Sequence, residues 1–249
     1  MPLPPLDAIP PALAAPSDYE PFARERMSAE AWAYFSGGAA DEVTLRRNRE
    51  AFDALLLHGR VLAGLGGNDT RVSLFGAELP FPVLLAPVAY QKMAHPQGEL
   101  AAALGAGAVG TGMVVSTFAS FTLEEIARQA PSPLCFQLYF QPDRAVTLDL
   151  VRRAEAAGYR AVVATVDAPV AAFRNREHRA AFRLPPGVDL ANLRPYPMPP
   201  PPENLAALLA AAPRWEDIAW LRSVTKLPVL LKGVLSPIDA ERALGEGLD

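Results

Sequence analysis

The polar side chains that could do chemistry in this chain of 249 residues gather at the ends of apolar runs. They are Pro87–Gln91, Ser116, Gln137, Tyr139, Thr165, Asp167 and Lys232. A lysine there could offset negative charge on a ring cofactor, and hydroxyl and amide groups could hydrogen-bond a polar heterocycle. Tyrosines and an arginine suit a carboxylate substrate, and an aspartate could orient a catalytic histidine.

Each of these side chains also has a purely structural interpretation. Ser116 could cap a turn, and Gln137 could satisfy backbone groups. Tyr139 could pack on a helix, Asp167 could be a turn residue, and Lys232 could be an exposed loop cation. Their coincidence at the ends of successive runs favours one site, because ligands of parallel α/β folds bind at the carboxyl ends of the strands.

The apolar runs are predicted to be the strands of an α/β fold with a parallel sheet, because helix-like segments fill most gaps between them. The expected strands are Pro82–Ala86, Gly112–Ser116, Leu134–Tyr139, Ala161–Val166 and Val229–Lys232. Only 17 residues follow Lys232, so the repeat of strand and helix is unfinished.

Local signals mark several other elements. Capping boxes at Ser17–Glu20 and Thr122–Glu125 predict helix starts, and Gly37–Gly38 predicts a left-handed helix stop. Gly76 predicts a short hairpin between two β-rich segments. A long excursion follows Asp167, and its proline-rich part can be neither helix nor central strand.

Composition excludes several classes of protein. The net charge of −4 gives no field that would attract nucleic acid or an anionic membrane. Arg46, Arg47 and Arg49 are interpreted as a solvated helix face. The single cysteine, Cys135, lies in an apolar run and is expected to be a buried thiol. Without a signal peptide or a run of about 18 apolar residues, a cytoplasmic protein is expected.

Residues 86–99, APVAYQKMAHPQGE, closely resemble the family of FMN-dependent L-2-hydroxy acid oxidases and dehydrogenases, which includes glycolate oxidase and lactate oxidase. The likeness extends to four more segments in the same order. They are YFSGGA at 34–39, FQLY at 136–139, TVDAP at 165–169 and LKGV at 231–234.

The resemblance implies a TIM (β/α)8 barrel, represented here by an incomplete barrel of about five βα units with an N-terminal helical extension. Residues 1–249 would form part of one domain, with the arm and helices in 1–70 and the barrel units in 80–249. The family oxidises an L-2-hydroxy acid, such as lactate or glycolate, to the 2-oxo acid by hydride transfer to flavin N5. FMN is the implied cofactor, no metal is expected, and a complete protein would be a homo-oligomer.

For the cofactor, the resemblance implies that the backbone of Pro87, Val88 and Ala89 lies along the flavin. It further implies hydrogen bonds to the flavin ring from three strand-end side chains, and a cation that stabilises the reduced flavin. These residues are Ser116, Gln137 and Thr165 for the hydrogen bonds, and Lys232 for the cation.

For the substrate, the resemblance places Tyr34 at the carboxylate and Tyr139 near the hydroxyl. Asp167 would pair with the catalytic histidine. In the family, an arginine beyond the fourth strand contacts the substrate. Arg174 matches the position of this arginine by ungapped spacing, whereas Arg176 matches it by the glutamate that follows. Arg174 is the preferred assignment.

The family's catalytic histidine and a second substrate arginine belong to a Ser-Asn-His-Gly-Gly-Arg segment, which residues 233–249 do not match. The 249-residue chain alone is therefore expected to be C-terminally truncated and inactive, and poorly folded or self-associating. One alternative is an inactive remnant that associates with a full-length relative through open strand edges. Another alternative is a different FMN barrel enzyme, such as an isoprenoid diphosphate isomerase. Tyr34 and Tyr139 make this alternative less favoured, because they suit a carboxylate substrate.

Overall fold

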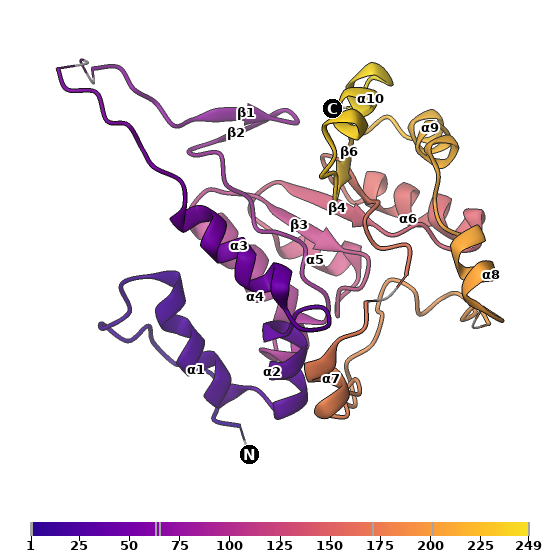
Figure 1. Cartoon of the computed structure of the whole chain (residues 1–249), viewed down its shortest axis with the longest axis horizontal. Helices are drawn as coiled ribbons and strands as arrows, with labels where there is room; N and C mark the ends of the chain where they lie inside the picture. The colour runs from indigo at the N-terminus through magenta and orange to yellow at the C-terminus, as the bar shows by residue number, and fades with distance from the viewer. Residues whose placement is uncertain (1, 63, 65, 171, 201, 249) are drawn as a thin grey trace. The chain divides into compact units, whose positions relative to one another are not determined.

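The structure is a computed structural model that describes residues 2–62, 64, 66–170, 172–200 and 202–248. The chain divides into two compact units. The first comprises residues 1–69, 93–95 and 172–185, and the second comprises residues 70–92, 96–171 and 186–249. Figure 1 shows the helices and strands of both, most of them labelled.

The first unit is helical. Its helices are α1 (Tyr19–Arg26), α2 (Ala29–Ser36), α3 (Val43–Asp53) and α7 (Asn175–Arg179), with a 3-10 turn, η1, over Pro16–Asp18. Two segments of this unit that are far apart in sequence are hydrogen-bonded to each other. The Ala40 N–H donates to the carbonyl of Phe173 at 2.8 Å. The Asn175 amide also donates to the carbonyl of Ala40, at 2.9 Å.

Two local predictions in this unit are wrong. The Ser17–Glu20 capping box does not form; the Asp18 carboxylate instead accepts hydrogen bonds from the backbone of Ala14 and Ala15, each at 2.8 Å. Asp18 thus caps the 3-10 turn η1, within which Ser17 lies, and α1 begins after it at Tyr19. Gly37, which follows α2, has an extended φ of −85° rather than a left-handed one.

The second unit contains a parallel sheet, and the predicted α/β class is confirmed. The strand order is β3 (Met113–Ser116), β4 (Leu134–Leu138), β5 (Val162–Thr165) and β6 (Val229–Lys232). The register pairs Ser116 with Gln137 and Thr165 with Lys232, which brings the strand-end side chains to one edge.

Helices connect these strands and cover the sheet (Figure 1). They are α4 (Gly98–Ala108), α5 (Leu123–Gln129), α6 (Arg144–Ala156), α8 (Leu205–Ala210), α9 (Trp215–Val224) and α10 (Pro237–Gly245). A further 3-10 turn, η2, spans Gln91–Met93. The capping box at Thr122–Glu125 is confirmed, since the Thr122 hydroxyl and the Glu125 carboxylate each accept from the other's backbone N–H.

The first predicted strand is not formed. Within Pro82–Ala86 only Leu85 pairs with the sheet, as an isolated parallel bridge to Met113. Pro82 has no N–H to donate, and so the ladder cannot extend through it. The barrel segment in the described residues is therefore four strands plus this bridge. The predicted hairpin is confirmed as β1 (Val72–Leu74) and β2 (Ala77–Leu79) around Gly76, whose φ is +72°.

The core of this unit lies between the sheet and its helices. Phe136 and Leu138 from β4 pack with Ile126 of α5 and Leu150 of α6, and all four are fully buried. Cys135 is 5% exposed, and burial raises the pKa of its thiol to about 11, so the thiol stays protonated at neutral pH.

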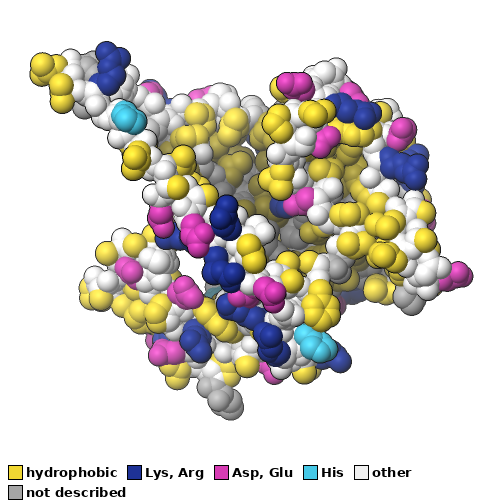
Figure 2. All heavy atoms as spheres, viewed as in Figure 1, with side chains coloured by type: hydrophobic (Ala, Val, Ile, Leu, Met, Phe, Trp, Pro, Cys, Tyr) yellow, Lys and Arg dark blue, Asp and Glu magenta, His cyan; other side chains and the backbone are white. Residues whose placement is uncertain are grey.

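The region of α9 and α10 carries apolar side chains on its surface. Leu235, Ile238 and Leu244 are exposed, and Figure 2 shows hydrophobic side chains mixed with charged ones where Figure 1 labels these helices. Among the described residues, β6 pairs only with β5, so its other edge is open. None of the helices in the described ranges is long and apolar enough to cross a membrane.

Candidate functional site

Three polar side chains form a hydrogen-bonded row across the carboxyl ends of β3, β4 and β5. The Ser116 hydroxyl donates to Gln137 Oε1 at 3.1 Å, and Gln137 Nε2 donates to Thr165 Oγ1 at 2.9 Å. The exposed fractions are 3% for Ser116, 2% for Gln137 and 4% for Thr165. The row is thus a fixed set of neutral groups that can both donate and accept hydrogen bonds.

Lys232 extends this row onto β6, where it pairs in register with Thr165. Its Nζ lies 3.6 Å from Asp167 Oδ1, and both side chains are about two-fifths exposed. Asp167 was expected to pair with a histidine, and in the described residues its ion-pair partner is Lys232. The pair places one cation and one anion beside the buried neutral row.

Gly233 is required next to this ion pair. Its φ is +106°, and a Cβ built on it would lie 2.3 Å from both Cβ and Cγ of Asp167. Any larger residue would push Asp167 away and would strain the backbone. The glycine after Lys232 therefore lets the carboxylate approach the end of β6.

Aromatic rings stand beside the same edge of the sheet. The Phe118 ring lies 4.9 Å from the Tyr139 ring and 6.2 Å from the Tyr90 ring, measured between centroids. Burial, followed by the negative charge of Asp167, raises the pKa of Tyr139. The Tyr139 hydroxyl is therefore a proton-bearing donor at neutral pH.

The loop of Pro87, Val88 and Ala89 follows the Leu85 bridge and runs beside the loop after β3. Tyr90, the next residue, donates its N–H to the carbonyl of Phe118 at 3.0 Å. The backbone of this loop thus lies next to the Ser116 strand end, on the same edge as the polar row.

In the first unit, the structure brings Tyr34 and Arg174 together. The Arg174 guanidinium carbon lies 5.3 Å from the centre of the Tyr34 ring. Its Nη2 donates to the carbonyls of Tyr34 at 3.0 Å and Gly37 at 2.5 Å, and its Nη1 pairs with Glu177 at 2.5 Å. The Tyr34 ring also stacks on Phe182, with a centroid separation of 5.2 Å.

Arg176 has different partners. Its Nε and Nη2 contact the two carboxylate oxygens of Glu42, at 2.6 and 2.7 Å, and its Nη1 approaches Ser36. Figure 2 shows lysine and arginine side chains gathered over the region where Figure 1 labels α3 and α7. Arg174 contacts the predicted substrate tyrosine, whereas Arg176 makes a two-pronged ion pair with Glu42.

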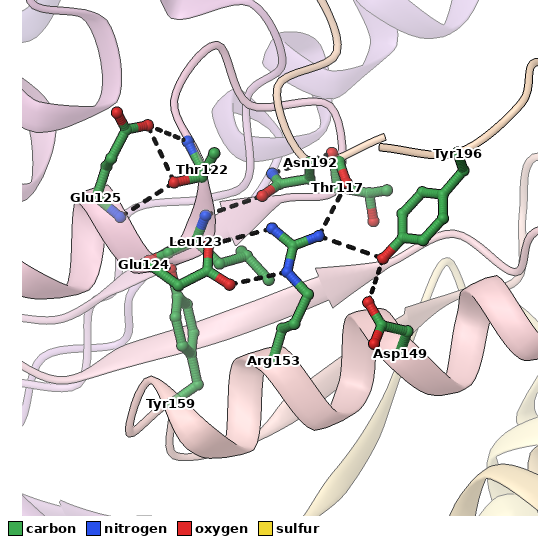
Figure 3. Close-up of polar contacts among 10 residues, drawn as sticks. All are labelled: Thr117, Thr122, Leu123, Glu124, Glu125, Asp149, Arg153, Tyr159, Asn192 and Tyr196. Carbon is green, nitrogen blue, oxygen red and sulfur yellow. Dashed lines mark hydrogen bonds and ion pairs between the residues drawn. The ribbon is translucent and has the colours of Figure 1, made fainter. Parts of the chain in front are cut away.

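Sequence reasoning missed Asn192, which lies in the long excursion after β5 and is completely buried. Its Oδ1 accepts from Leu123 N–H at 2.8 Å, and its Nδ2 donates to the carbonyl of Thr117 at 3.3 Å (Figure 3). The signal in the sequence is a lone amide flanked by apolar Ala191 and Leu193. Asn192 thus anchors the excursion to the loop that carries Phe118.

Arg153 of α6 completes this network, as Figure 3 shows. It makes two hydrogen bonds to the Glu124 carboxylate, at 2.8 and 3.1 Å, and donates to the Asn192 carbonyl at 3.0 Å. A fourth hydrogen bond reaches the Tyr196 hydroxyl at 3.4 Å. The hydrogen bond from Arg153 lowers the pKa of Glu124, so the pair is ionised at neutral pH.

Comparison with known proteins identifies relatives of the chain. The family model described as FMN-dependent dehydrogenase matches residues 23–249. An L-lactate oxidase of Alicycliphilus denitrificans is 43% identical over 98% of this chain and 68% of its own length. The glycolate oxidase of Spinacia oleracea is 37% identical over 93% of this chain and 65% of its own length.

Solved structures give the same result. A mandelate oxidase variant with (S)-mandelic acid superposes with a TM-score of 0.84 at 38% identity, over 93% of this chain and 65% of that one. A second structure of the variant contains an FMN adduct and gives a TM-score of 0.83. The chain therefore spans about two thirds of the length of the proteins that it matches.

Proposed function

The chain belongs to the FMN-dependent dehydrogenase family, and we propose that it supplies the flavin site and part of the substrate site of an enzyme that oxidises L-2-hydroxy acids to 2-oxo acids. The observation that carries this proposal is the continuous row of Ser116, Gln137 and Thr165, which ends at Lys232. The relatives named as lactate, glycolate and mandelate oxidases support the same substrate class.

The donor set fits FMN. The polar edge of a flavin ring needs neutral partners that can donate and accept, and the hydroxyl and amide groups of the row have this property. A cation is also needed where the ring gains negative charge, and Lys232 supplies one. Ser116, Gln137, Thr165 and Lys232 would hold the ring, and the backbone of residues 87–89 would line it.

Bound FMN would supply the two-electron acceptor that amino acid side chains lack. Lys232 offsets the negative charge that develops during the reaction, and Asp167, 3.6 Å away, keeps its side chain oriented. Tyr139 carries its proton at neutral pH, because its pKa is raised, and can donate a hydrogen bond to a substrate oxygen. The Phe118 ring beside Tyr139 offers an apolar surface to the substrate side chain.

For the substrate carboxylate we assign Tyr34 and Arg174. A guanidinium is planar and always charged, and it therefore suits a carboxylate better than a lysine would. Arg174 and Arg176 each pair with a glutamate, Glu177 and Glu42 respectively. The Arg174 guanidinium also lies 5.3 Å from the centre of the Tyr34 ring. Arg174 is thus the better candidate of the two.

The first test measures the binding of FMN to the 249-residue chain. Binding is monitored by the quenching of FMN fluorescence. Replacing Ser116 by Ala should raise the Kd for FMN about tenfold, the typical effect of one lost hydrogen bond in a buried site. The matched control is Ser223→Ala on α9, since the Ser223 hydroxyl donates to the nearby Trp220 carbonyl, far from the polar row in sequence. An equal effect of the two variants would contradict the assignment.

The second step is an assay of the protein made from its native gene, with its intact mass recorded at the same time. Glycolate, L-lactate and L-mandelate are offered without oxygen, and loss of visible flavin absorption is followed. Reduction by at least one acid, with the 2-oxo acid as product, is expected. A protein that binds FMN but is reduced by none of these acids would rule out the proposed reaction.

We also propose that the protein is cytoplasmic and that it forms a homo-oligomer. The single buried thiol of Cys135 supports a reducing compartment, since the chain cannot form an internal disulfide. The exposed side chains of Leu235 and Ile238 support association between copies. Light scattering during gel filtration tests the assembly, and a monomer at all concentrations would refute it.

A further inference from the structure

We propose that Glu99 is a positioning residue of the flavin site, which ties the loop of residues 88–92 to the loop of residues 117–120. This inference rests on the proposed function, because the first loop would line FMN. Glu99 lies in the first turn of α4 and has no exposed surface. A buried carboxylate is unfavourable unless it is hydrogen-bonded, so its contacts indicate what it stabilises.

One carboxylate oxygen of Glu99 joins the two loops. Its Oε1 accepts from Gln91 N–H at 3.1 Å and from Ser120 N–H at 2.9 Å. Gln91 is two residues beyond Ala89, and Ser120 is four residues beyond Ser116. One oxygen atom therefore receives a hydrogen bond from each loop.

Further contacts make the same junction. Lys92 N–H donates to the Ser120 hydroxyl at 3.2 Å, and Tyr90 N–H donates to the Phe118 carbonyl at 3.0 Å. The rings of Tyr90 and Phe118 stack above these bonds with an angle of 18° between their planes. Besides the two hydrogen bonds to Glu99, the two loops therefore share two direct hydrogen bonds and a ring contact.

Gly98 brings Glu99 close enough to act. Its φ is +40°, and a Cβ at this position would lie 3.0 Å from Lys92 N. The start of α4 consequently packs directly against the first loop. The other oxygen, Oε2, is buried and has no hydrogen-bond partner among the described residues. The contribution of Glu99 to the junction is therefore made through Oε1 alone.

The test compares Glu99→Ala, Glu99→Gln and Glu155→Ala in the 249-residue chain. Glutamine keeps an acceptor oxygen, and alanine removes it. Glu155 is the matched control, because its carboxylate also joins two segments, through Thr225 Oγ1 at 2.5 Å and Lys226 N–H at 3.0 Å. That junction lies before β6, at the opposite edge of the sheet.

The first readout is hydrogen–deuterium exchange without flavin. Glu99→Ala should speed exchange about tenfold or more in peptides that cover residues 90–93 and 118–121, because two hydrogen bonds to a buried acceptor are lost. Glu99→Gln should stay within about threefold of the parent chain. Glu155→Ala should change only peptides near residues 224–228. Unchanged exchange in both loops of Glu99→Ala, or equal changes in the Ala and Gln variants, would overturn the proposal.

The second readout is the Kd for FMN. Glu99→Ala should weaken binding about tenfold, Glu99→Gln should restore it, and Glu155→Ala should leave it unchanged. Equal weakening by Glu155→Ala would show a general loss of stability and would overturn the positioning role. If the parent chain binds no FMN, the proposed function fails, whereas the exchange readout still decides whether Glu99 joins the loops.

A milder variant covers the case in which Glu99→Ala does not fold. Ser120→Ala removes only the hydrogen bond from Lys92 N–H. It should speed exchange at residues 91–93 about threefold to tenfold while the 224–228 peptides stay unchanged. No change at residues 91–93 would count against the junction.

Discussion

Lys232 Nζ lies 3.6 Å from Asp167 Oδ1, across the ends of two neighbouring parallel strands. The two residues come from β6 and from the segment after β5, which are separated in sequence by the whole excursion. Because both side chains are about two-fifths exposed, solvent screens the pair and its contribution to stability is modest. Its importance is positional, since it fixes a cation beside the buried polar row.

Gly233→Ala tests whether this arrangement depends on glycine. The substitution should destabilise the chain by about 2–4 kcal/mol, from backbone strain and from the clash with Asp167. Gly105→Ala in α4 is the control; nothing lies within 4 Å of its Cβ position, so it should stabilise by about 0.5–1 kcal/mol. Urea unfolding measures both, and a neutral Gly233→Ala would contradict the close approach of Asp167 to this glycine.

Lys232→Met tests the role of the cation. Loss of the positive charge should make the midpoint potential of bound FMN more negative, and should slow reduction by substrate about 10²–10³-fold. Lys226→Met is the control, because Lys226 is exposed and precedes β6 at the other edge of the sheet. Redox titration against dyes gives the potential. If the potential does not change in Lys232→Met, the cation has another role.

Tyr159 should make the protein sensitive to alkali. Its side chain is 2% exposed, its hydroxyl donates to the carbonyl of Leu123 at 3.1 Å, and burial raises its pKa. A pKa raised by folding contributes stability that is present below the unfolded value of about 10 and is lost as the pH rises beyond it. Tyr159→Phe should flatten this loss above pH 10, at a cost of about 1 kcal/mol at pH 7.

The control for Tyr159 is Tyr19→Phe, since Tyr19 is 42% exposed. Unfolding free energies measured from pH 8 to about pH 11 should show the same alkaline slope in this control as in the parent chain. A parent-like slope in Tyr159→Phe would mean that another group dominates the alkaline loss.

Glu124 and Arg153 should make the protein sensitive to acid. The Arg153 hydrogen bond lowers the pKa of Glu124, so its contribution to stability is present above the unfolded value of 4.5 and is lost as the pH falls through the folded value. Arg153→Met should lower stability at pH 7 and make it less dependent on pH below about 5. Arg128→Met, an exposed substitution in the last turn of α5, is the control. An unaltered acid dependence in Arg153→Met would contradict the pairing.

Local hydrogen bonding explains which elements were predictable. The Thr122–Glu125 capping box and the Gly76 hairpin each depend on a few consecutive residues, and both form as expected. The strand ends were also predictable, because apolar runs of strand length leave little choice about where Ser116 and Gln137 fall. The Ser17–Glu20 box does not form because Ser17 lies inside the 3-10 turn Pro16–Asp18, which Asp18 caps through the N–H groups of Ala14 and Ala15.

Long-range contacts explain what was not predictable. Two arginines within three positions match the same substrate contact, and only the folded chain decides that Arg174 meets Tyr34, 140 residues away, while Arg176 meets Glu42. The same holds for the loops that Glu99 joins.

The sequence by itself therefore determined the fold class, the family and the residue types at the strand ends, because these follow from periodicity, local hydrogen bonds and matching motifs. The tertiary structure decided the pairings, including Lys232 with Asp167 and Asn192 with Thr117 and Leu123. The physical reason is that a side chain has many possible partners in sequence, and only packing brings one of them within hydrogen-bond distance.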